Sequence, residues 1–259
     1  MSKNAIIVGM ARSGTSMTTA IFARKGYFVA ENKSDQLQVA DRFNPSGYWE
    51  AEPLLKSNRE ILNNAGFTGD NTWFHNEITT EQANKINKIE ISEQHKKLIE
   101  LYQNNSPWVW KDPRLCYTLG YWWPHLDQEN TQVILLQRNP IEIYKSFKNV
   151  EKSWYCTAEF NQATVFDRIE KHIESARQIL NQYKIPYIEL NYSEYSQHPE
   201  IVAKRLSDNF DIDVNSSDLG FSKRSNHSTT IGKLSMLSNN IFQSIATSII
   251  RVIKSILNR

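Results

Sequence analysis

Cysteine and histidine are scarce in this chain, which removes two common ways of stabilising or equipping a domain. The 259 residues include two cysteines, Cys116 and Cys156, and six scattered histidines. Two cysteines do not make the disulfide framework of a small secreted domain, and no spacing of cysteine or histidine resembles a zinc site. We therefore expect a protein of a reducing compartment that uses no metal.

Charge of one sign and long apolar runs are also lacking. Lysine and arginine number 30 against 28 acidic residues, so the net charge is +2 and nothing favours a nucleic-acid partner. No stretch reaches the apolar length of a membrane span. The first apolar run leads directly into a glycine-containing loop and leaves no room for a signal peptide. These absences predict a soluble, cytoplasmic protein.

The length and the hydrophobic content suit one α/β domain, since 259 residues with 40% hydrophobic side chains can bury a sizeable core. We find no low-complexity linker and no repeat of solenoid length. We therefore predict one domain over residues 1–232 and a separate tail over residues 233–259.

Short apolar runs alternate with segments of helical periodicity. Strands are predicted at residues 5–8, 27–30, 108–110, 133–137 and 186–190. Helices are predicted at residues 15–25, 48–64, 79–102, 115–126, 141–150, 157–183 and 198–210, of which 79–102 reads as one solvated surface helix. This alternation predicts a mainly parallel sheet covered by helices, and the aromatic segment 121–125 is assigned to the core rather than to a pocket.

A glycine-containing loop follows the first predicted strand, in the segment IIVGMARSGTS at residues 6–16. Gly9 and Gly14 permit a close backbone approach, so that successive N–H groups can converge on an anion at the start of the next helix. The spacing is that of the nucleotide-binding loop GxxxxGK[ST]. The alternative interpretation is a strand-to-helix turn that binds no ligand.

This loop departs from the usual nucleotide-binding pattern at one position. Thr15 stands where a kinase or ATPase has the lysine that contacts the β- and γ-phosphates, and Arg12 is the only cation of the loop. A small-molecule kinase that uses ATP and magnesium is therefore the less favoured alternative, and we predict no metal. The segment GMARSGTS resembles the 5′-phosphosulfate loop of sulfotransferases that use 3′-phosphoadenosine 5′-phosphosulfate (PAPS).

That resemblance implies a single-domain, three-layer fold of the P-loop type, with about five mainly parallel strands flanked by helices. It also implies PAPS as co-substrate, with adenosine 3′,5′-bisphosphate as the product. Ser13, Gly14, Thr15 and Ser16 would hold the 5′-phosphate through loop amides, and Arg12 would contact the bridging and sulfuryl oxygens.

A second motif lies in VILLQRNPIEIYKSF at residues 133–147, where a buried strand delivers Arg138 to its carboxyl end and Ser146 follows on the next helix. An arginine and a hydroxyl in this arrangement can grip one phosphate. The spacing resembles the 3′-phosphate site of sulfotransferases. The alternative is a surface arginine that precedes a helix started by Pro140.

A third motif, WVWKDPR at residues 108–114, places Lys111, Asp112 and Arg114 around a proline at a strand end. Two cations and one acid can neutralise a developing negative charge. The motif resembles the KDP element of tyrosylprotein sulfotransferases and some bacterial ones, which implies that Lys111 lies near the sulfuryl group. The alternative is a structural ion pair that closes a turn.

Glu50 ends the segment NPSGYWE at residues 44–50, which resembles the NPxGxWE element of bacterial sulfotransferase-like proteins. Two aromatic rings precede this glutamate, and screening from water raises the pKa of a carboxyl towards the range of a general base. Glu50 is the predicted base, with Asp112 and His227 next. The alternative is an acid in the first helical turn that complements the helix dipole.

The last basic cluster is FSKRSNHS at residues 221–228, with Lys223, Arg224 and His227. The resemblance implies that Lys223 and Arg224 contact the 3′-phosphate, although the glycine-rich form of cytosolic family members is missing. Beyond it, residues 219–259 contain no acidic residue, and an amphipathic helix is predicted at residues 241–257. Such a helix would dock on an anionic membrane, on a second subunit or on the domain itself.

Together these motifs predict a sulfotransferase that moves a sulfuryl group from PAPS to an acceptor hydroxyl. Glu50, Lys111 and Arg12 are the predicted catalytic residues. The aromatic content favours a glycan or lipid-linked glycan acceptor. A nucleotide-binding module without catalytic activity is the alternative from another class.

Overall fold

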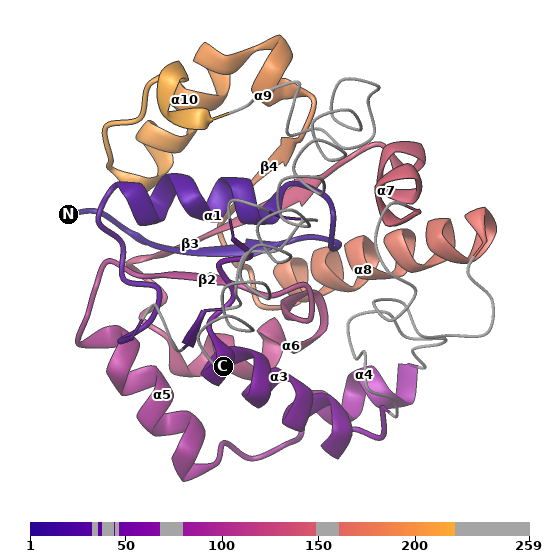
Figure 1. Cartoon of the computed structure of the whole chain (residues 1–259). Helices are drawn as coiled ribbons and strands as arrows, with labels where there is room; N and C mark the ends of the chain where they lie inside the picture. The colour runs from indigo at the N-terminus through magenta and orange to yellow at the C-terminus, as the bar shows by residue number, and fades with distance from the viewer. Residues whose placement is uncertain (33–35, 38–43, 45–46, 68–79, 149–160, 221–259) are drawn as a thin grey trace, which may run out of the picture.

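A parallel sheet of four strands lies at the centre of the described chain (Figure 1). A computed structural model describes residues 1–32, 36–37, 44, 47–67, 80–148 and 161–220. The strands are β1 (Asn4–Val8), β2 (Val109–Lys111), β3 (Thr131–Gln137) and β4 (Tyr187–Asn191), in the order β2-β1-β3-β4. Each neighbouring pair is parallel, which confirms the predicted α/β class.

The prediction of about five strands is wrong by one for the described residues, because residues 27–30 form no strand. Phe28 makes one isolated parallel bridge with Trp108 beside the edge strand β2. Tyr27 and Val29 instead bury their side chains against the helical layer. Residues 27–30 therefore have the alternating burial that is typical of a strand, but they lack the ladder of backbone hydrogen bonds that defines one.

The helices and short 3-10 turns alternate with these strands along the chain. Their bounds are α1 (Thr15–Arg24), α3 (Glu52–Asn64), α4 (Thr80–Ile86), α5 (Glu93–Gln103), α6 (Leu115–Trp122), η1 (Trp123–His125), α7 (Pro140–Phe147), α8 (Gln162–Gln182), α9 (Glu194–Gln197), α10 (Pro199–Phe210) and η3 (Ser216–Leu219).

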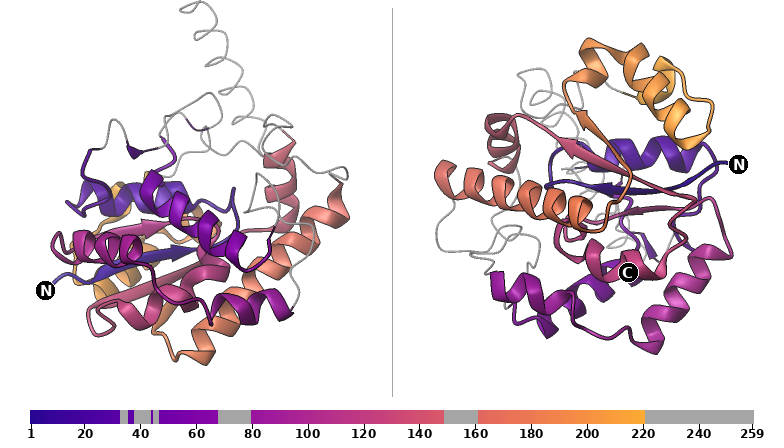
Figure 2. Two further views of the ribbon diagram at one scale, coloured as in Figure 1. Left: turned by 90° about the horizontal axis from the view of Figure 1, so that it is seen from below. Right: turned by 180° about the vertical axis from the view of Figure 1, so that it is seen from behind.

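Successive residues of β1 face opposite layers, so both faces of the strand are buried. Ala5 and Ile7 contact the core shared with α1 and α10, whereas Ile6 and Val8 contact the core shared with α3, α5, α6 and α8. The views from below and behind show α8 on the face opposite to α1 and α10 (Figure 2). The result is the predicted three-layer arrangement.

Two helical predictions need correction. The stretch 79–102 is not one surface helix, because α4 and α5 are separate within its described residues. Ser92 is the N-cap of α5, and its Oγ accepts from the backbone N–H of His95 at 3.2 Å. Ile86 and Leu98 are buried in the core. The helix predicted from residue 48 begins at Glu52 instead, after an extended Ala51.

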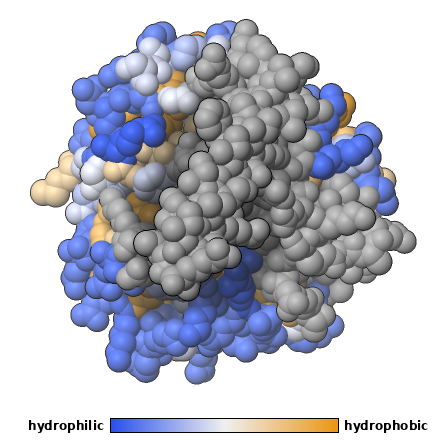
Figure 3. All heavy atoms as spheres, in the orientation of Figure 1, coloured by the Kyte–Doolittle hydropathy of each residue, from blue (hydrophilic) through white to orange (hydrophobic). Residues whose placement is uncertain are grey.

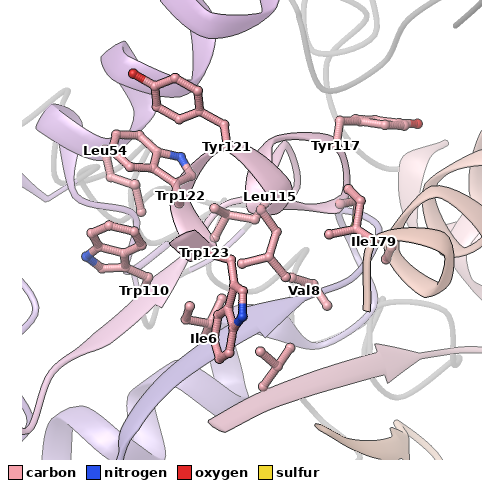
Figure 4. Packing of buried hydrophobic residues seen from close by; sticks show 14 of the residues in the cluster. Ile6, Val8, Leu54, Trp110, Leu115, Tyr117, Tyr121, Trp122, Trp123 and Ile179 are labelled. Atoms are coloured by element: carbon pink, nitrogen blue, oxygen red, sulfur yellow. The ribbon is translucent and has the colours of Figure 1, made fainter. Parts of the chain in front are cut away.

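Aromatic rings fill the core on the α6 side of the sheet. Trp110 and Trp122 (Figure 4) meet edge to face with ring centres 5.3 Å apart. The ring centre of Tyr102 lies 5.2 Å from that of Trp110. Tyr121, Trp122 and Trp123 are buried as predicted for the segment 121–125, while His125 is exposed. The tryptophans therefore contribute to the core.

Hydrophilic residues cover most of the described surface in the orientation of Figure 3. Among the described residues, no helix has both the length and the apolar character needed to cross a bilayer. The predicted tail, its boundary at residue 232 and its amphipathic helix lie outside the described residues.

Candidate functional site

The carboxyl ends of the four parallel strands bring the sequence motifs together at one edge of the sheet. Gly9 follows β1, Lys111 ends β2, Arg138 follows β3 and Tyr192 follows β4. In open α/β sheets, ligands bind beyond this edge. Its groups come from segments up to about 180 residues apart in the chain, yet the sheet register places them side by side.

The glycine-containing loop ends at the N-terminus of α1. Gly14 is the N-cap, in a left-handed conformation with φ 97° and no side chain to cap the helix. The first backbone N–H groups of a helix have no partner within it, and they carry the positive end of the helix dipole. Thr15 and Ser16 lie in that first turn, so their amides suit an anion.

Ser13 differs from its neighbours in the loop. Its N–H donates to the carbonyl of Met10 at 3.2 Å, so this amide closes the loop rather than facing a ligand. Its buried Oγ has no hydrogen-bond partner. An unpaired polar atom buried in a loop of this geometry fits an anion-binding site, because a bound phosphate oxygen would satisfy it.

Two glycines are required by close contacts. A Cβ at Gly9 would lie 2.5 Å from the carbonyl oxygen of Leu136 on the neighbouring strand β3. A Cβ at Gly14 would overlap the ring of Tyr192, and φ at this position also disfavours any other residue. The loop therefore packs directly on β3 and on the residue that follows β4.

Arg12 links the loop to the motif that carries Arg138 and Ser146. Its Nε donates to Ser146 Oγ on α7 at 3.0 Å, and its backbone oxygen accepts from the guanidinium of Arg138 at 2.9 Å. Arg12 has φ 69°, which is strained for a residue with a side chain. Strain of this kind is often found at binding sites. Here it occurs in Arg12, whose backbone contacts the second arginine at this edge of the sheet, Arg138.

Arg138 is buried and held on three sides. Besides its bond to Arg12, its Nε pairs with Glu142 at 2.9 Å, and its guanidinium lies 4.3 Å from the centre of the Tyr192 ring. The sequence interpretation missed Tyr192, although its place directly after a predicted parallel strand is a usable signal. The ring of Tyr192 lies against both Gly14 of the loop and the guanidinium of Arg138.

Glu50 and Lys111 form a buried ion pair beside the loop. Glu50 Oε1 contacts Lys111 Nζ, and the same ammonium donates to Ser16 Oγ at 3.2 Å. The side chain of Lys111 is 1% exposed and that of Glu50 is 10% exposed. The second carboxylate oxygen of Glu50 is buried without a hydrogen-bond partner. A ligand hydroxyl would supply the missing donor.

Burial is the main influence on both members of this pair. It raises the pKa of Glu50, while the contacting ammonium of Lys111 opposes the rise. Burial also lowers the pKa of Lys111, and Glu50 opposes that fall. A buried carboxylate or a buried ammonium is unfavourable without an opposite charge beside it. Removal of either Glu50 or Lys111 therefore destabilises the charged form of the other.

Glu50 is not in the first turn of a helix, so the alternative of a dipole-complementing acid does not describe it. The acidic residue in the first turn of α3 is Glu52. Before it, Trp49 has φ 61°, and Gly47 and Asn44 close a turn in which Gly47 N–H donates to the Asn44 carbonyl at 3.0 Å. This turn and the strained Trp49 direct Glu50 towards Lys111.

Asp112 and Arg114 match the alternative of a structural ion pair. Arg114 donates to Asp112 Oδ1 from its side chain at 2.9 Å and from its backbone at 3.0 Å. Asn58 on α3 donates to Oδ2 at 2.8 Å. Both oxygens of Asp112 are thus engaged in a fully buried position, which favours a positioning role over that of a base.

An open pocket lies over the loop and runs along α1. It is lined by Arg12, Gly14, Thr15, Ser16, Met17, Ala20, Arg24, Asn44, Gly47, Arg138, Tyr192 and Gly220. Five of the predicted donor-binding residues therefore line one cavity, whereas Ser13, Ser146, Glu50 and Lys111 are not part of its wall. Lys223, Arg224 and His227 lie outside the described residues.

Groups of three or more histidine, cysteine, aspartate or glutamate side chains that would hold a metal are not found in the described part of the chain. The site instead offers two arginines, a buried lysine, hydroxyls and helix-terminal amides near the buried carboxylate of Glu50. This donor set suits a ligand with several anionic groups and a reaction that needs one proton acceptor.

A parallel sheet that leads into a glycine-containing loop and a helix N-terminus, with arginines from the loop and from a neighbouring strand end, is an arrangement of α/β proteins that suits a bound anion. Residues 5–216 match the Sulfotransferase family. The chain therefore belongs to that family, and the resemblance inferred from its motifs is confirmed.

The solved structures that are similar to this one include two sulfotransferases. A sulfotransferase domain from the curacin biosynthetic pathway is 17% identical, with a TM-score of 0.51 over 89% of this chain and 84% of that chain. A sulfotransferase from Mycobacterium tuberculosis is 11% identical, with a TM-score of 0.49 over 90% of this chain and 75% of that chain. The first likeness supports the fold alone. No curated protein gives a significant match to the chain.

Proposed function

We propose that this protein transfers a sulfuryl group from PAPS to an acceptor hydroxyl. Membership of the Sulfotransferase family supports a transferase of this class. The observation that carries the proposal is the Glu50–Lys111 pair: a buried carboxylate with one unpaired oxygen lies against a buried ammonium that also contacts the phosphate loop. A module that only bound a nucleotide would not need such a pair.

The donor would be held at both phosphates. The amides of Thr15 and Ser16 and the unpaired hydroxyl of Ser13 suit the 5′-phosphosulfate, at the positive end of α1. Arg138 and Ser146 suit the 3′-phosphate, because the guanidinium can bind two oxygens at once. Arg12 contacts both of these residues, so it lies between the two ends of the donor.

In the proposed reaction the acceptor oxygen attacks sulfur while the bond between sulfur and the bridging phosphate oxygen breaks. The acceptor proton passes to Glu50, and adenosine 3′,5′-bisphosphate leaves with the bonding electrons. Arg12 and Lys111 stabilise the charge that develops on the bridging and sulfuryl oxygens, so positioning and fixed positive charge suffice without a metal.

The acceptor is proposed as a hydroxyl compound without a narrower class. The aromatic content that favoured a glycan or a lipid-linked glycan belongs largely to the core, as Trp108, Trp110 and Trp122 are buried. The small-molecule kinase alternative gains no support from the site, since no lysine of the loop stands ready for a β- or γ-phosphate.

Radiolabelled PAPS tests the proposal directly. We expect the protein, without added metal, to move label into at least one compound of pooled phenol, glycan and lipid acceptors, and more slowly into water. The matched control is Glu50→Gln, which keeps the shape of the site and should lose the transfer. Absence of label in every acceptor and in inorganic sulfate, despite a folded protein that binds the bisphosphate, would contradict an enzymatic role.

A further inference from the structure

The catalytic pair is attached to a second, fully buried polar network. Asn58 on α3 donates to Asp112, and its Oδ1 accepts from Thr118 Oγ1 at 2.7 Å and from Trp122 Nε1 at 2.8 Å. Asp112 accepts in addition from Arg114. All five residues are at most 3% exposed. The network joins α3, the end of β2 and α6.

Both members of the catalytic pair are neighbours of this network along the chain. Glu50 lies two residues before α3, which carries Asn58, and Lys111 directly precedes Asp112. The bond between Asn58 and Asp112 therefore ties the segment that carries the carboxylate to the segment that carries the ammonium. The four charges of Glu50, Lys111, Asp112 and Arg114 sum to zero, which makes their joint burial tolerable.

We propose that Asp112 is a positioning residue that keeps Glu50 an effective base beside Lys111, and that Asn58 and Arg114 lock it in place for this task. This inference rests on the proposed function, because it assigns a task within the same site. An ammonium in contact with a carboxylate weakens that carboxylate as a base. The fixed negative charge of Asp112 offsets this effect. Lys111 can therefore stabilise the sulfuryl oxygens while Glu50 keeps enough basicity to accept the proton.

The charges around the pair agree in sign with this assignment. After burial, the charged groups that act on the pKa of Glu50 are Lys111, which lowers it, and Asp112, which raises it; a backbone hydrogen bond of Glu50 also lowers it. The charged groups that act on Lys111 are Glu50 and Asp112, which raise its pKa, and Arg12, which lowers it. Asp112 is thus the acid that opposes the influence of Lys111 on Glu50.

The hydrogen-bond pattern allows a variant that moves the charge and keeps the contacts. Asp112→Asn alone would set two amide N–H groups against each other at Asn58. Asp112→Asn combined with Asn58→Asp reverses that bond: the new amide donates to the new carboxylate, Arg114 still finds an oxygen, and Thr118 and Trp122 still find an acceptor. The negative charge, however, leaves the residue next to Lys111.

The test is a titration of the Glu50 carboxyl by carbon-13 NMR in the unliganded protein, assigned with Glu50→Gln. We expect the pKa of Glu50 to fall by about one pH unit in Asp112→Asn and in the swapped double variant. The acid limb of the pH–rate profile for sulfuryl transfer should move to lower pH in both variants. Thr118→Val, which weakens the network but keeps the charge, should leave the pKa of Glu50 unchanged.

An unchanged pKa of Glu50 in the swapped variant would overturn the inference, as would an equal shift in Thr118→Val, because either result makes the network merely structural. The swapped variant decides the matter if Asp112→Asn alone fails to fold. The titration needs neither donor nor acceptor. A shifted pKa without any sulfuryl transfer would therefore refute the proposed function and leave this inference standing.

Discussion

Glu50→Gln should lower the turnover of sulfuryl transfer by roughly 10²- to 10⁴-fold, while the affinity for adenosine 3′,5′-bisphosphate hardly changes. The amide keeps the shape of the carboxyl but accepts no proton. In the proposed site the bisphosphate would be held by the loop and by Arg138, which Glu50 does not contact in any bond described above. Steady-state kinetics with a reactive acceptor, together with calorimetry, separate the two quantities.

The direction of the pH dependence of turnover follows from the pKa of Glu50. Since burial raises the pKa of Glu50, the unaltered enzyme should lose activity as the pH falls through that raised pKa, and the Gln variant should lack this acid limb. Glu52→Gln is the matched control, because Glu52 lies two residues away, is exposed and pairs with Arg59 at 3.4 Å. Ordinary turnover in Glu50→Gln would direct attention to His227, since both oxygens of Asp112 are engaged.

Lys111→Met should damage both stability and turnover. It leaves the buried carboxylate of Glu50 without its ion-pair partner, and loss of one member of a buried pair costs about 3–5 kcal/mol of unfolding free energy. Without the ammonium the pKa of Glu50 rises further, so a larger fraction of the base is protonated at any given pH. Denaturant unfolding and the rate of label transfer measure the two effects.

A double variant separates these effects. Lys111→Met with Glu50→Gln removes both charges, so most of the lost stability should return while turnover stays low. Lys96→Met, at an exposed pair with Glu93, should change neither. If Lys111→Met unfolded at the same denaturant concentration as the parent, the description of a tightly coupled buried pair would be wrong.

The motifs that could be predicted from sequence are those whose geometry is local. A strand, a loop and a helix start follow one another within residues 4–24, so the spacing of Gly9 and Gly14 already predicts a candidate anion site. Arg138 and Ser146 likewise lie on a strand end and the next helix. Parallel strands bring the separate motifs to a common edge of the sheet. The proximity of these motifs could therefore be predicted from the sequence.

Contacts between distant segments could not be predicted in the same way. Asn58 reads as an ordinary polar residue of α3, and only the fold places it against Asp112 and Trp122. Residues 27–30 have the composition of a strand, but the neighbouring β2 has only three residues and offers them a single bridge. Both outcomes depend on tertiary packing rather than on local pattern.

Selectivity between nucleotides tests the central claim most directly, because the 3′-phosphate distinguishes the proposed donor from ATP and AMP. In titration calorimetry the unaltered protein should bind adenosine 3′,5′-bisphosphate more tightly than AMP by on the order of 2 kcal/mol, or roughly 30-fold, and Arg138→Ala should remove most of that difference. Equal affinity for the bisphosphate and AMP, or tighter binding of ATP with magnesium, would contradict the account.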